Sequence, residues 1–167
     1  VGPVGELDFG DMAKAFLAAD YLLNDGKYTH LLIPVFDKRL ILPETIAREF
    51  CASLKQLPSL HAPSIVNSPQ AAFQYLTDVA TPTLPMLKDV DLTPLAAYRN
   101  AAGNIFMTYV APRRILLQGP QYQAHDGSHL DAFGGLTLAF NPQGQLRSVC
   151  WRLVTDEDVR QIQLTAA

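Results

Sequence analysis

Residues 134–154 read GGLTLAFNPQGQLRSVCWRLV and indicate the fold class of this chain. Two apolar runs with alternating side chains flank the segment Asn141-Pro142-Gln143-Gly144. Alternation over such runs is typical of half-buried strands, and Pro and Gly in a short connection are typical of a turn. The pattern therefore predicts a β-hairpin with long arms. It follows a first half in which apolar residues recur at helical spacing.

The first half of the chain predicts three helices and one short strand. The segment Asn24-Asp25-Gly26 ends the first helix, because Gly26 readily takes a left-handed conformation. Pro43 suits the first turn of the third helix, where a missing N–H has no partner to lose. The expected elements are a helix that begins near Asp8 or Asp11 and ends near residue 24, a helix over 28–36, a strand over 39–42 and a helix over 44–57.

Residues 58–94 hold half of the twelve prolines. One helix fits inside this stretch, with Phe73 and Leu76 pointing inward, and the remainder predicts a rigid, extended connection. The hairpin is preceded by a further apolar run and followed by a short helix that Thr155 caps. The bounds expected for these elements are 69–79 for the inner helix, 104–117 for a long strand and 155–163 for the closing helix.

Composition indicates one soluble domain over residues 1–167. The chain is 49% hydrophobic and 17% charged, and its net charge of -3 gives no electrostatic reason to expect nucleic acid. No apolar run is long enough for a membrane span, and the first ten residues carry no secretory signal, so we expect an intracellular protein. Cys51 and Cys150 form no CxxC motif and lie in apolar patterns, which favours buried, reduced thiols. No motif indicates a cofactor.

Two segments carry a resemblance to a known superfamily. Residues 16–54 hold a helix, an Asn-Asp-Gly break before an aromatic residue, a short helix, a strand ending in Pro43 and a third helix. Residues 136–159 hold two strands around Asn-Pro-x-Gly. This order resembles the NTF2-like, or SnoaL-like, superfamily, including its carotenoid-binding C-terminal domains. The resemblance implies an α+β, cone-shaped fold with N-terminal helices packed on a strongly bent antiparallel sheet, and residues 58–94 as an enlargement.

The resemblance also bears on function. Steroid-isomerase-like members place a Tyr, a general-base Asp and a second carboxylic acid where this chain has Ala19, Leu42 and Leu136. All three residues are apolar, so proton transfer beside a carbonyl lacks its acid and its base. The carotenoid-holding Trp and Tyr of other members would also fall at Leu136 and near Ala19. We therefore expect a non-catalytic domain that binds partners and holds an apolar small ligand in its cone. The alternative is a SnoaL-type polyketide cyclase, isomerase or dehydratase.

The enzyme alternative has its own candidate residues, which are titratable groups able to move a proton. They are Asp20, Tyr21, Tyr98, His125 and Asp131. Two His and two Asp within residues 125–131 could also ligate a metal ion. The pair Asp126-Gly127 is a common turn, so we favour a solvated loop over a metal site.

The binding alternative depends on one apolar interior. Helical and alternating spacing predicts that side chains from both halves of the chain converge in the cone. The residues expected to line it are Phe16, Phe36, Phe50, Tyr109, Leu136, Leu138, Val149 and Trp151.

The opposite face of the hairpin predicts self-association. It carries Leu146, Ser148, Cys150 and Arg152, which are small or amphipathic rather than a charged row. An exposed sheet face of this kind is usually covered, and a two-fold interface brings identical faces together. We therefore expect a homodimer, or a heterodimer with a similar domain, formed through the sheet.

Overall fold

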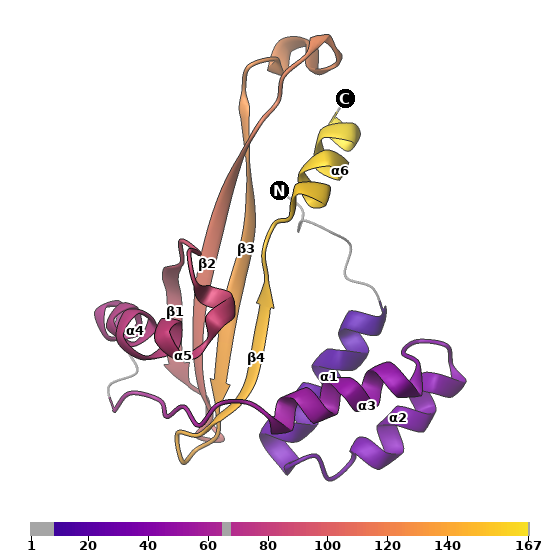
Figure 1. Ribbon diagram of the computed structural model, residues 1–167, viewed down its shortest axis with the longest axis vertical. Coiled ribbons are helices and arrows are strands. Elements are labelled where there is room, and N and C mark those ends of the chain that lie inside the picture. The colour runs from indigo at the N-terminus through magenta and orange to yellow at the C-terminus, as the bar shows by residue number, and fades with distance from the viewer. Residues whose placement is uncertain (1–8, 65–67, 167) are drawn as a thin grey trace.

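The computed structural model describes residues 9–64 and 68–166 and has an α+β architecture (Figure 1). Three helices come first, and a four-stranded antiparallel sheet in the order β1-β2-β3-β4 follows. The class expected from the sequence is therefore confirmed. The principal elements are α1 (Phe9–Asn24), α2 (Thr29–Lys38), α3 (Glu44–Lys55), α4 (Pro69–Tyr75), β1 (Thr93–Arg99), β2 (Ile105–Leu116), β3 (His129–Phe140), β4 (Leu146–Arg152) and α6 (Asp156–Ala166).

The two central strands form a long, regular ribbon. β2 and β3 pair from Ile105 with Phe140 to Leu116 with His129, without a bulge. Bulges are a usual cause of bending in a sheet, so the regular pairing favours a gentle twist. The expected strong bend is wrong, because the sheet is not strongly curled. β1 and β4 have seven residues each against twelve in β2 and β3, so one end of the ribbon projects beyond its neighbours (Figure 1).

The hairpin between β3 and β4 is confirmed. The amide of Asn141 donates to the carbonyl of Gln145 at 2.9 Å, and Gly144 takes a φ of 80°, which glycine adopts without steric cost. The pairing register shifts after Ala139. Leu146 consequently joins the packed core of the sheet. The sequence predicts Leu146 on the outer face of the hairpin. This prediction is wrong, because it assumes simple alternation along β4 and the register shift breaks that alternation.

The three N-terminal helices begin and end within two residues of the expected bounds. The strand expected over residues 39–42 is wrong, because the chain turns there. The amide of Ile41 donates to the carbonyl of Phe36 at 3.0 Å and closes the end of α2. Leu40 takes a φ of 55° and is exposed. Because the chain folds back onto the end of α2 here, its backbone is not extended and cannot pair as a β-strand.

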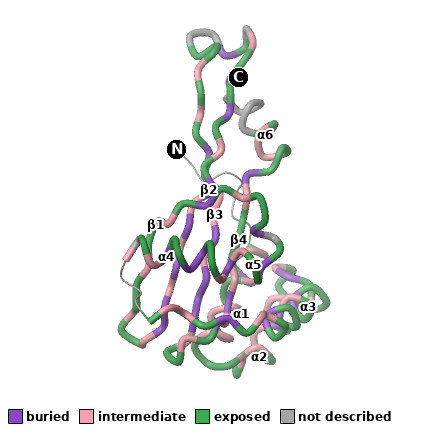
Figure 2. Tube along the Cα trace, turned by 60° about the vertical axis from the view of Figure 1, so that its left-hand side comes forward, coloured by how far each residue is buried: buried purple, intermediate pink, exposed green. Residues whose placement is uncertain are grey.

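Buried apolar residues form two main cores rather than one. Buried positions occur both along the sheet and in the N-terminal helices in Figure 2. The larger core lies between one face of the sheet and the described parts of the proline-rich stretch, residues 60–64 and 68–92. The smaller core lies among α1, α2 and α3, and α1 and α3 contact the sheet at β4. The N-terminal helices thus pack on the sheet at this strand, whereas the proline-rich stretch covers the larger core. The fully buried large side chains of the larger core include Ile105, Met107, Tyr109, Leu136, Leu138 and Phe140.

The proline-rich stretch forms the cover of the sheet. Ser68 caps α4 by accepting a hydrogen bond from the amide of Ala71 at 3.4 Å, and α4 lies against β1. The helix expected over residues 69–79 is confirmed and runs on. Its continuation consists of the π-helical turn η1 (Leu76–Ala80), α5 (Thr81–Thr83) and the 3₁₀ turn η2 (Pro85–Leu87).

Burial along the cover follows its contact with the sheet. Leu76 is buried as expected, whereas Phe73 is 55% exposed on the outer side. Leu60, Leu84 and Leu87 are also buried against the sheet. The part expected to be an extended connection is instead a packed layer, because its leucines supply the apolar surface that the open sheet needs.

The closing helix α6 begins as expected with Thr155 as its cap. The amide of Asp158 donates to Thr155 Oγ1 at 3.1 Å, and the amide of Thr155 donates back to the carboxylate of Asp158 at 2.8 Å. Arg113 on β2 donates to the carbonyl of Val154 at 2.7 Å and pairs with Asp156. These contacts hold the start of α6 against the ribbon. Within the described ranges, no helix is both long and apolar enough to cross a membrane.

Candidate functional site

Asp20 acts in this structure as the cap of a neighbouring helix. It lies on the buried face of α1, and its Oδ2 accepts hydrogen bonds from the amide of Tyr28 at 2.9 Å and the hydroxyl of Thr29 at 3.0 Å. These groups stand at the start of α2, where backbone donors lack partners within the helix. Its other oxygen, Oδ1, is buried and has no hydrogen-bond partner among the described residues. The carboxylate therefore joins α1 to α2.

The remaining enzyme candidates lie in separate regions. Tyr98 is on β1, where its ring stacks on Phe106 with 5.4 Å between centroids. His125 ends the 3₁₀ turn η3 (Pro120–His125), and Asp131 pairs with Arg114 at 3.4 Å on the projecting end of the ribbon. α1, β1 and this end of the ribbon are far apart in Figure 1. The five candidates are thus not brought into one site.

The loop between β2 and β3 is closed by its own hydrogen bonds. The hydroxyl of Ser128 donates to the carbonyl of His125 at 2.6 Å, and the carboxylate of Asp126 accepts from the amide of Gly119 at 2.7 Å. Gly127 takes a φ of 78°, as expected of the second residue of an Asp-Gly turn. No three His, Cys, Asp or Glu side chains within the described ranges are grouped as metal ligands.

The expected apolar interior is divided between the two cores. Phe36 and Phe50 pack against the core of the three helices, while Tyr109, Leu136 and Leu138 are buried in the core of the sheet. The convergence of these side chains on one interior is therefore wrong. The other three residues expected to line it are Val149, which is partly buried against the sheet core, Phe16, which is 58% exposed, and Trp151, which is 37% exposed.

Tyr109 shows why the sheet core is closed to a ligand at this point. Its side chain is fully buried, and its hydroxyl donates to the carbonyl of Ala72 in α4 at 3.0 Å. Burial raises its pKa, with a smaller contribution from Tyr75, so the phenol stays neutral. Burial also raises the pKa of Tyr75 to about 12. Both rings serve the packing of the cover on the sheet.

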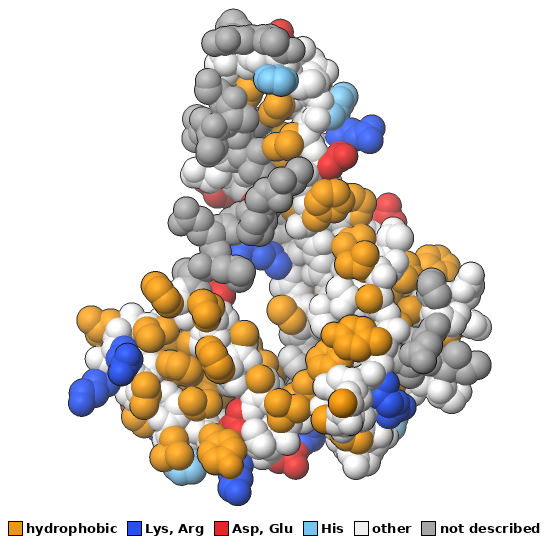
Figure 3. Space-filling view, turned by 180° about the vertical axis from the view of Figure 1, so that it is seen from behind, with side chains coloured by type: hydrophobic (Ala, Val, Ile, Leu, Met, Phe, Trp, Pro, Cys, Tyr) orange, Lys and Arg blue, Asp and Glu red, His pale blue; other side chains and the backbone are white. Residues whose placement is uncertain are grey.

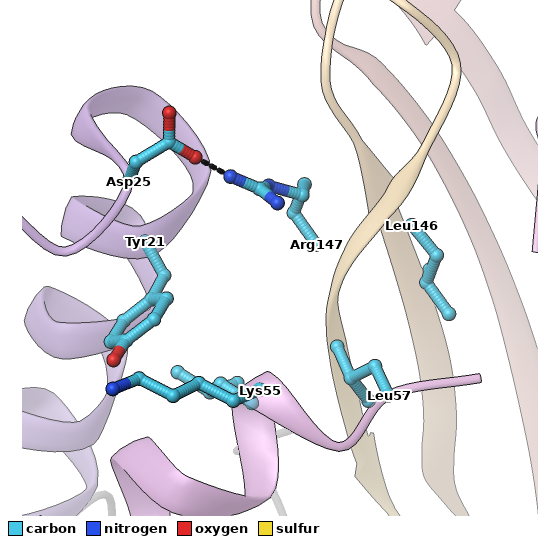
Figure 4. A pocket seen from close by; sticks show the side chains of 7 residues that line it. Tyr21, Asp25, Lys55, Leu57, Leu146 and Arg147 are labelled. Carbon is cyan, nitrogen blue, oxygen red and sulfur yellow. Dashed lines mark ion pairs between the residues drawn. The ribbon is translucent and has the colours of Figure 1, made fainter. Parts of the chain in front are cut away.

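A pocket of about 320 Å³ lies where the helical core meets β4 (Figure 4). The last turns of α1 and α3 form one side, and the first residues of β4 form the other. Three leucines and four polar side chains face it. The lining residues are Tyr21, Asp25, Leu54, Lys55, Leu57, Leu146 and Arg147.

The polar groups of this pocket are mostly donors. Arg147 pairs with Asp25, and its Nε is buried with no hydrogen-bond partner in the part of the chain that the structure describes. The tips of Tyr21 and Lys55 lie beside each other across the pocket from Arg147 in Figure 4. The ring of Tyr21 also packs on Gly26, where an added Cβ would stand 3.0 Å from the ring. Gly26 has a φ of 76°, so this close approach and the turn both require glycine.

Sequence reasoning identified Tyr21 but missed the other members of this pocket. Lys55 and Arg147 are separated by 92 positions, and no motif connects them. The register shift after Ala139 decides how the first residues of β4 are placed, and alternation alone does not reveal that shift. The one available signal was Asn24-Asp25-Gly26, which marks a turn at the pocket rim.

The second face of the sheet is partly exposed and uncharged near its centre, whereas Ala139 and Ser148, which pair on this face near the hairpin turn, are buried. The Tyr98–Phe106 stack lies on it, and the hydroxyls of Thr108 and Thr137 stand 3.4 Å apart. Register pairs these side chains across β1, β2 and β3. Cys150 on β4 is exposed, so the expectation that both cysteines are buried holds only for Cys51. Burial raises the pKa of the Cys51 thiol, mainly by desolvation.

The exposed side of α1 carries a second apolar surface. Only Ala13, Leu17 and Asp20 of this helix are buried. The side chains at positions 9, 12, 16 and 23 are exposed instead. These positions are spaced three, four and seven residues apart. Hydrophobic side chains are prominent over the helices and over the sheet in Figure 3. We call the exposed set of Phe9, Met12, Phe16 and Leu23 the α1 stripe.

Comparison with known proteins identifies no relative of this chain. No protein-family model, no curated protein and no solved structure matches it. The functional argument therefore depends on the chain's own residues and geometry.

Proposed function

We propose that this chain is a non-catalytic, NTF2-like binding module that forms a dimer through the second face of its sheet. The proposal is supported above all by the part of that face that is accessible, which is lined by the Tyr98–Phe106 stack, the hydroxyls of Thr108 and Thr137, and Cys150. Soluble monomers rarely leave a large face of this composition uncovered. A partner of the same kind, either a second copy or a similar domain, would cover it.

The order of elements supports the NTF2-like part of the proposal. Three helices precede an antiparallel sheet that ends in a long hairpin, as in the superfamily that the sequence resembles. Two features differ from the expected cone: the sheet is not strongly curled, and the larger core is covered by residues 60–64 and 68–92 rather than by the N-terminal helices. The apolar ligand has less support than the dimer, because its expected lining residues are divided between two cores.

The geometry also gives less support to the enzyme alternative. A SnoaL-type reaction needs an acid and a base within reach of one substrate. Asp20 caps α2, Tyr98 stacks on Phe106, and Asp131 pairs with Arg114. These candidates lie in different regions of the molecule, where each already has a structural partner. Partner binding requires only the open face itself, so it is the function that we propose.

The dimer is tested by placing a charge at the centre of the open face. We expect the unmodified protein to have the mass of a dimer in size-exclusion chromatography with light scattering at micromolar concentration. Thr137→Arg should convert it to a monomer, because the interface would then bury an unpaired charge. The matched control is Thr77→Arg, which lies on the exposed side of the cover, and it should remain dimeric.

Thiol labelling provides a second measurement. Cys150 is on the proposed interface, whereas Cys51 is buried in the helical core. We expect Cys150 to react slowly with a thiol reagent in the dimer and rapidly in Thr137→Arg. A monomeric parent protein in which Cys150 reacts rapidly would contradict the proposal.

A further inference from the structure

We propose that the α1 stripe packs against the α1 stripe of a second copy of this chain, with the two helices antiparallel. Single exposed apolar residues are common, but a set of large ones along one helix indicates an interaction surface. Figure 3 shows hydrophobic side chains gathered over the N-terminal helices, at its lower left. The stripe lies on a different element from the open sheet face, so the proposal does not rest on the dimer proposed above.

The stripe faces away from the contacts that α1 makes within its own chain. One side of the helix packs on α2 and α3, where Ala13, Leu17 and Asp20 are buried. Another side faces β4, because Asp11 and, just past the end of the helix, Asp25 form ion pairs with arginines of that strand. With 3.6 residues per turn, the stripe positions lie on a third side, which is exposed to solvent.

The spacing of the stripe selects a helix as its partner. When the half-buried Ala19 is included, its positions follow one another three, four, three and four residues apart. This is the repeat of 3.5 residues by which two α-helices pack along a shared seam. Such a seam is narrower than the apolar face that a helix usually places on a broad core. The pattern therefore favours one helix as the occupant.

A second copy of α1 fits this seam because the large and small residues along it are complementary to themselves. When two copies run antiparallel about the middle of the helix, Phe16 faces the partner's Ala19, and Met12 faces the partner's Leu23. Each Phe16 ring then enters the space beside a small side chain, as packing of knobs into holes requires. A two-fold axis repeats this arrangement at both ends, because it brings the same patch of each copy together.

The charges of the helices also favour a second copy over a lipid surface. No position of the stripe is charged, so two copies meet there without repulsion between like charges. Residues 9–55 hold six acidic and six basic side chains, so the three helices have no net charge that would attract them to an anionic membrane.

The exposed area of the stripe sets the strength of the contact. Phe9 and Phe16 are 75% and 58% exposed, and Met12 and Leu23 are 49% and 58% exposed. At roughly 200 Å² for a large apolar side chain, covering two stripes removes about 1,000 Å² from solvent. Standard interfaces bury about 1,200–2,000 Å², and smaller ones are weak and transient. We therefore expect a Kd on the order of 100 µM for this contact alone.

The test is sedimentation equilibrium of the full chain carrying Thr137→Arg, which disrupts the proposed sheet contact. We expect reversible association of monomers between about 5 and 500 µM, a range that spans the expected Kd. Phe16→Glu in this background should weaken the association at least about tenfold, because the seam would then bury an unpaired charge. The matched control is Phe73→Glu, since Phe73 is 55% exposed on a helix of the cover, and it should leave the association unchanged. Circular dichroism establishes that each variant is folded.

An exchange of two residues tests the antiparallel register. Phe16→Ala should weaken the association severalfold, because it removes the large side chain from the seam. Ala19→Phe should also weaken it, because two large side chains would then face each other. The double variant again places one large and one small side chain at each level, so it should recover most of the affinity. Recovery of this kind requires that the two positions face each other across the contact.

The outcomes separate the alternatives. A Thr137→Arg protein that stays monomeric up to about 500 µM would overturn the proposal, as would equal association of Phe16→Glu and its control. Flotation with vesicles of phosphatidylcholine and phosphatidylserine provides another arm. Binding to vesicles that depends on Phe16, without self-association, would overturn the second copy and assign the stripe to a lipid surface.

A failure of the sheet dimer is distinguishable from a failure of the α1 contact. A micromolar dimer that survives Thr137→Arg but is lost in Phe16→Glu would mean that α1 carries the dimer and that the sheet does not. A micromolar dimer that is lost in Thr137→Arg, with weak association remaining at higher concentration, would support both contacts. In the parent protein, the two contacts together should join dimers into larger assemblies as the concentration rises.

Discussion

The sheet and the three N-terminal helices differ in how completely each buries its apolar residues. One face of the sheet is covered at its centre, where Met107, Tyr109 and Leu138 are inaccessible to solvent. In contrast, α1 buries only Ala13, Leu17 and Asp20 and leaves the α1 stripe exposed. Because burial of apolar surface is the main favourable contribution to folding, stability should be concentrated in the sheet and its cover. The helices carry the α1 stripe, so the least buried apolar surface lies in the part of the molecule with the smaller core.

The largest expected effect comes from the sheet core. Leu138→Ala should lower the free energy of unfolding by about 4 kcal/mol, because a fully buried leucine leaves both its transfer energy and a cavity behind. Urea denaturation followed by circular dichroism measures the change. Leu95→Ala on β1 is the control, since Leu95 is exposed, and it should change the free energy by less than about 0.5 kcal/mol. Similar losses in the two variants would contradict the assigned core.

The equivalent change in the helices should have a smaller effect. Leu17→Ala also removes a fully buried leucine, but the core around it is small and its neighbours can move inward. We expect a loss of about 2 kcal/mol, near the lower end for such substitutions. Amide hydrogen exchange should then increase in α1, α2 and α3 while β2 and β3 stay protected. Equal loss of protection in all of these elements would show that the two cores unfold as one.

Tyr109→Phe tests the contact between the sheet and its cover. The hydroxyl of Tyr109 donates to the carbonyl of Ala72, and this bond joins β2 to α4. Its removal should cost about 1 kcal/mol in the free energy of unfolding, the usual net contribution of one hydrogen bond. Tyr98→Phe is the control, because the Tyr98 ring is half exposed and stacks on Phe106. A loss from Tyr98→Phe that matched the Tyr109 variant would argue against a special role of the buried hydroxyl.

The cap of α6 predicts a modest dependence on pH. The amide and hydroxyl of Thr155 donate to Asp158 and lower the pKa of its carboxyl. A lowered folded-state pKa contributes stability above the unfolded-state value of about 3.9, and this contribution is lost as the pH falls through the folded-state pKa. Protection of the α6 amides should therefore decrease below about pH 4. The decrease should be smaller in Asp158→Asn, where Asp156, whose carboxyl pKa is lowered by its hydrogen bond and ion pair with Arg113, still contributes. It should be retained in full in Asp91→Asn, which alters an exposed carboxylate.

The smallest expected effect is on the α1 stripe. Phe16→Ala should change the free energy of unfolding by less than about 0.5 kcal/mol, since Phe16 is exposed. Its neighbour Leu17 gives the direct comparison within one helix. Thermal and urea denaturation measure both variants under the same conditions. A loss above about 2 kcal/mol for Phe16→Ala would mean that the stripe is covered in solution.

Local patterns in the sequence predicted most elements but did not predict which faces they bury. The three helices, the strand over β2, the hairpin and the Thr155 cap were all predicted correctly. The apolar spacing of α1 was interpreted as an inward face, yet the buried residues Ala13 and Leu17 lie on another side of the helix. Spacing identifies a helix from its period, whereas the packed side depends on what the rest of the chain places against it.

The pocket was beyond prediction for a similar reason. Tyr21 was a candidate as a titratable group, but its relation to Lys55 and Arg147 depends on how the helices meet β4. The register shift after Ala139 and the turn at Gly26 both contribute to that meeting. Neither the register shift nor the turn has a sequence signal strong enough to predict that residues so distant in the chain lie beside one another.

The sequence by itself determined the class and the order of most elements: helices, a proline-rich stretch, and an antiparallel sheet that ends in a hairpin. It did not predict β1, and it predicted a strand over residues 39–42 where the chain turns. Periodicity, turn residues and caps act over a few residues, so they can be identified without knowledge of the fold. Only the tertiary structure decided that residues 60–64 and 68–92 cover the sheet and that the helices form a core of their own. The physical reason is that apolar burial has no direction: several apolar faces could have covered the sheet, and their mutual fit selects one.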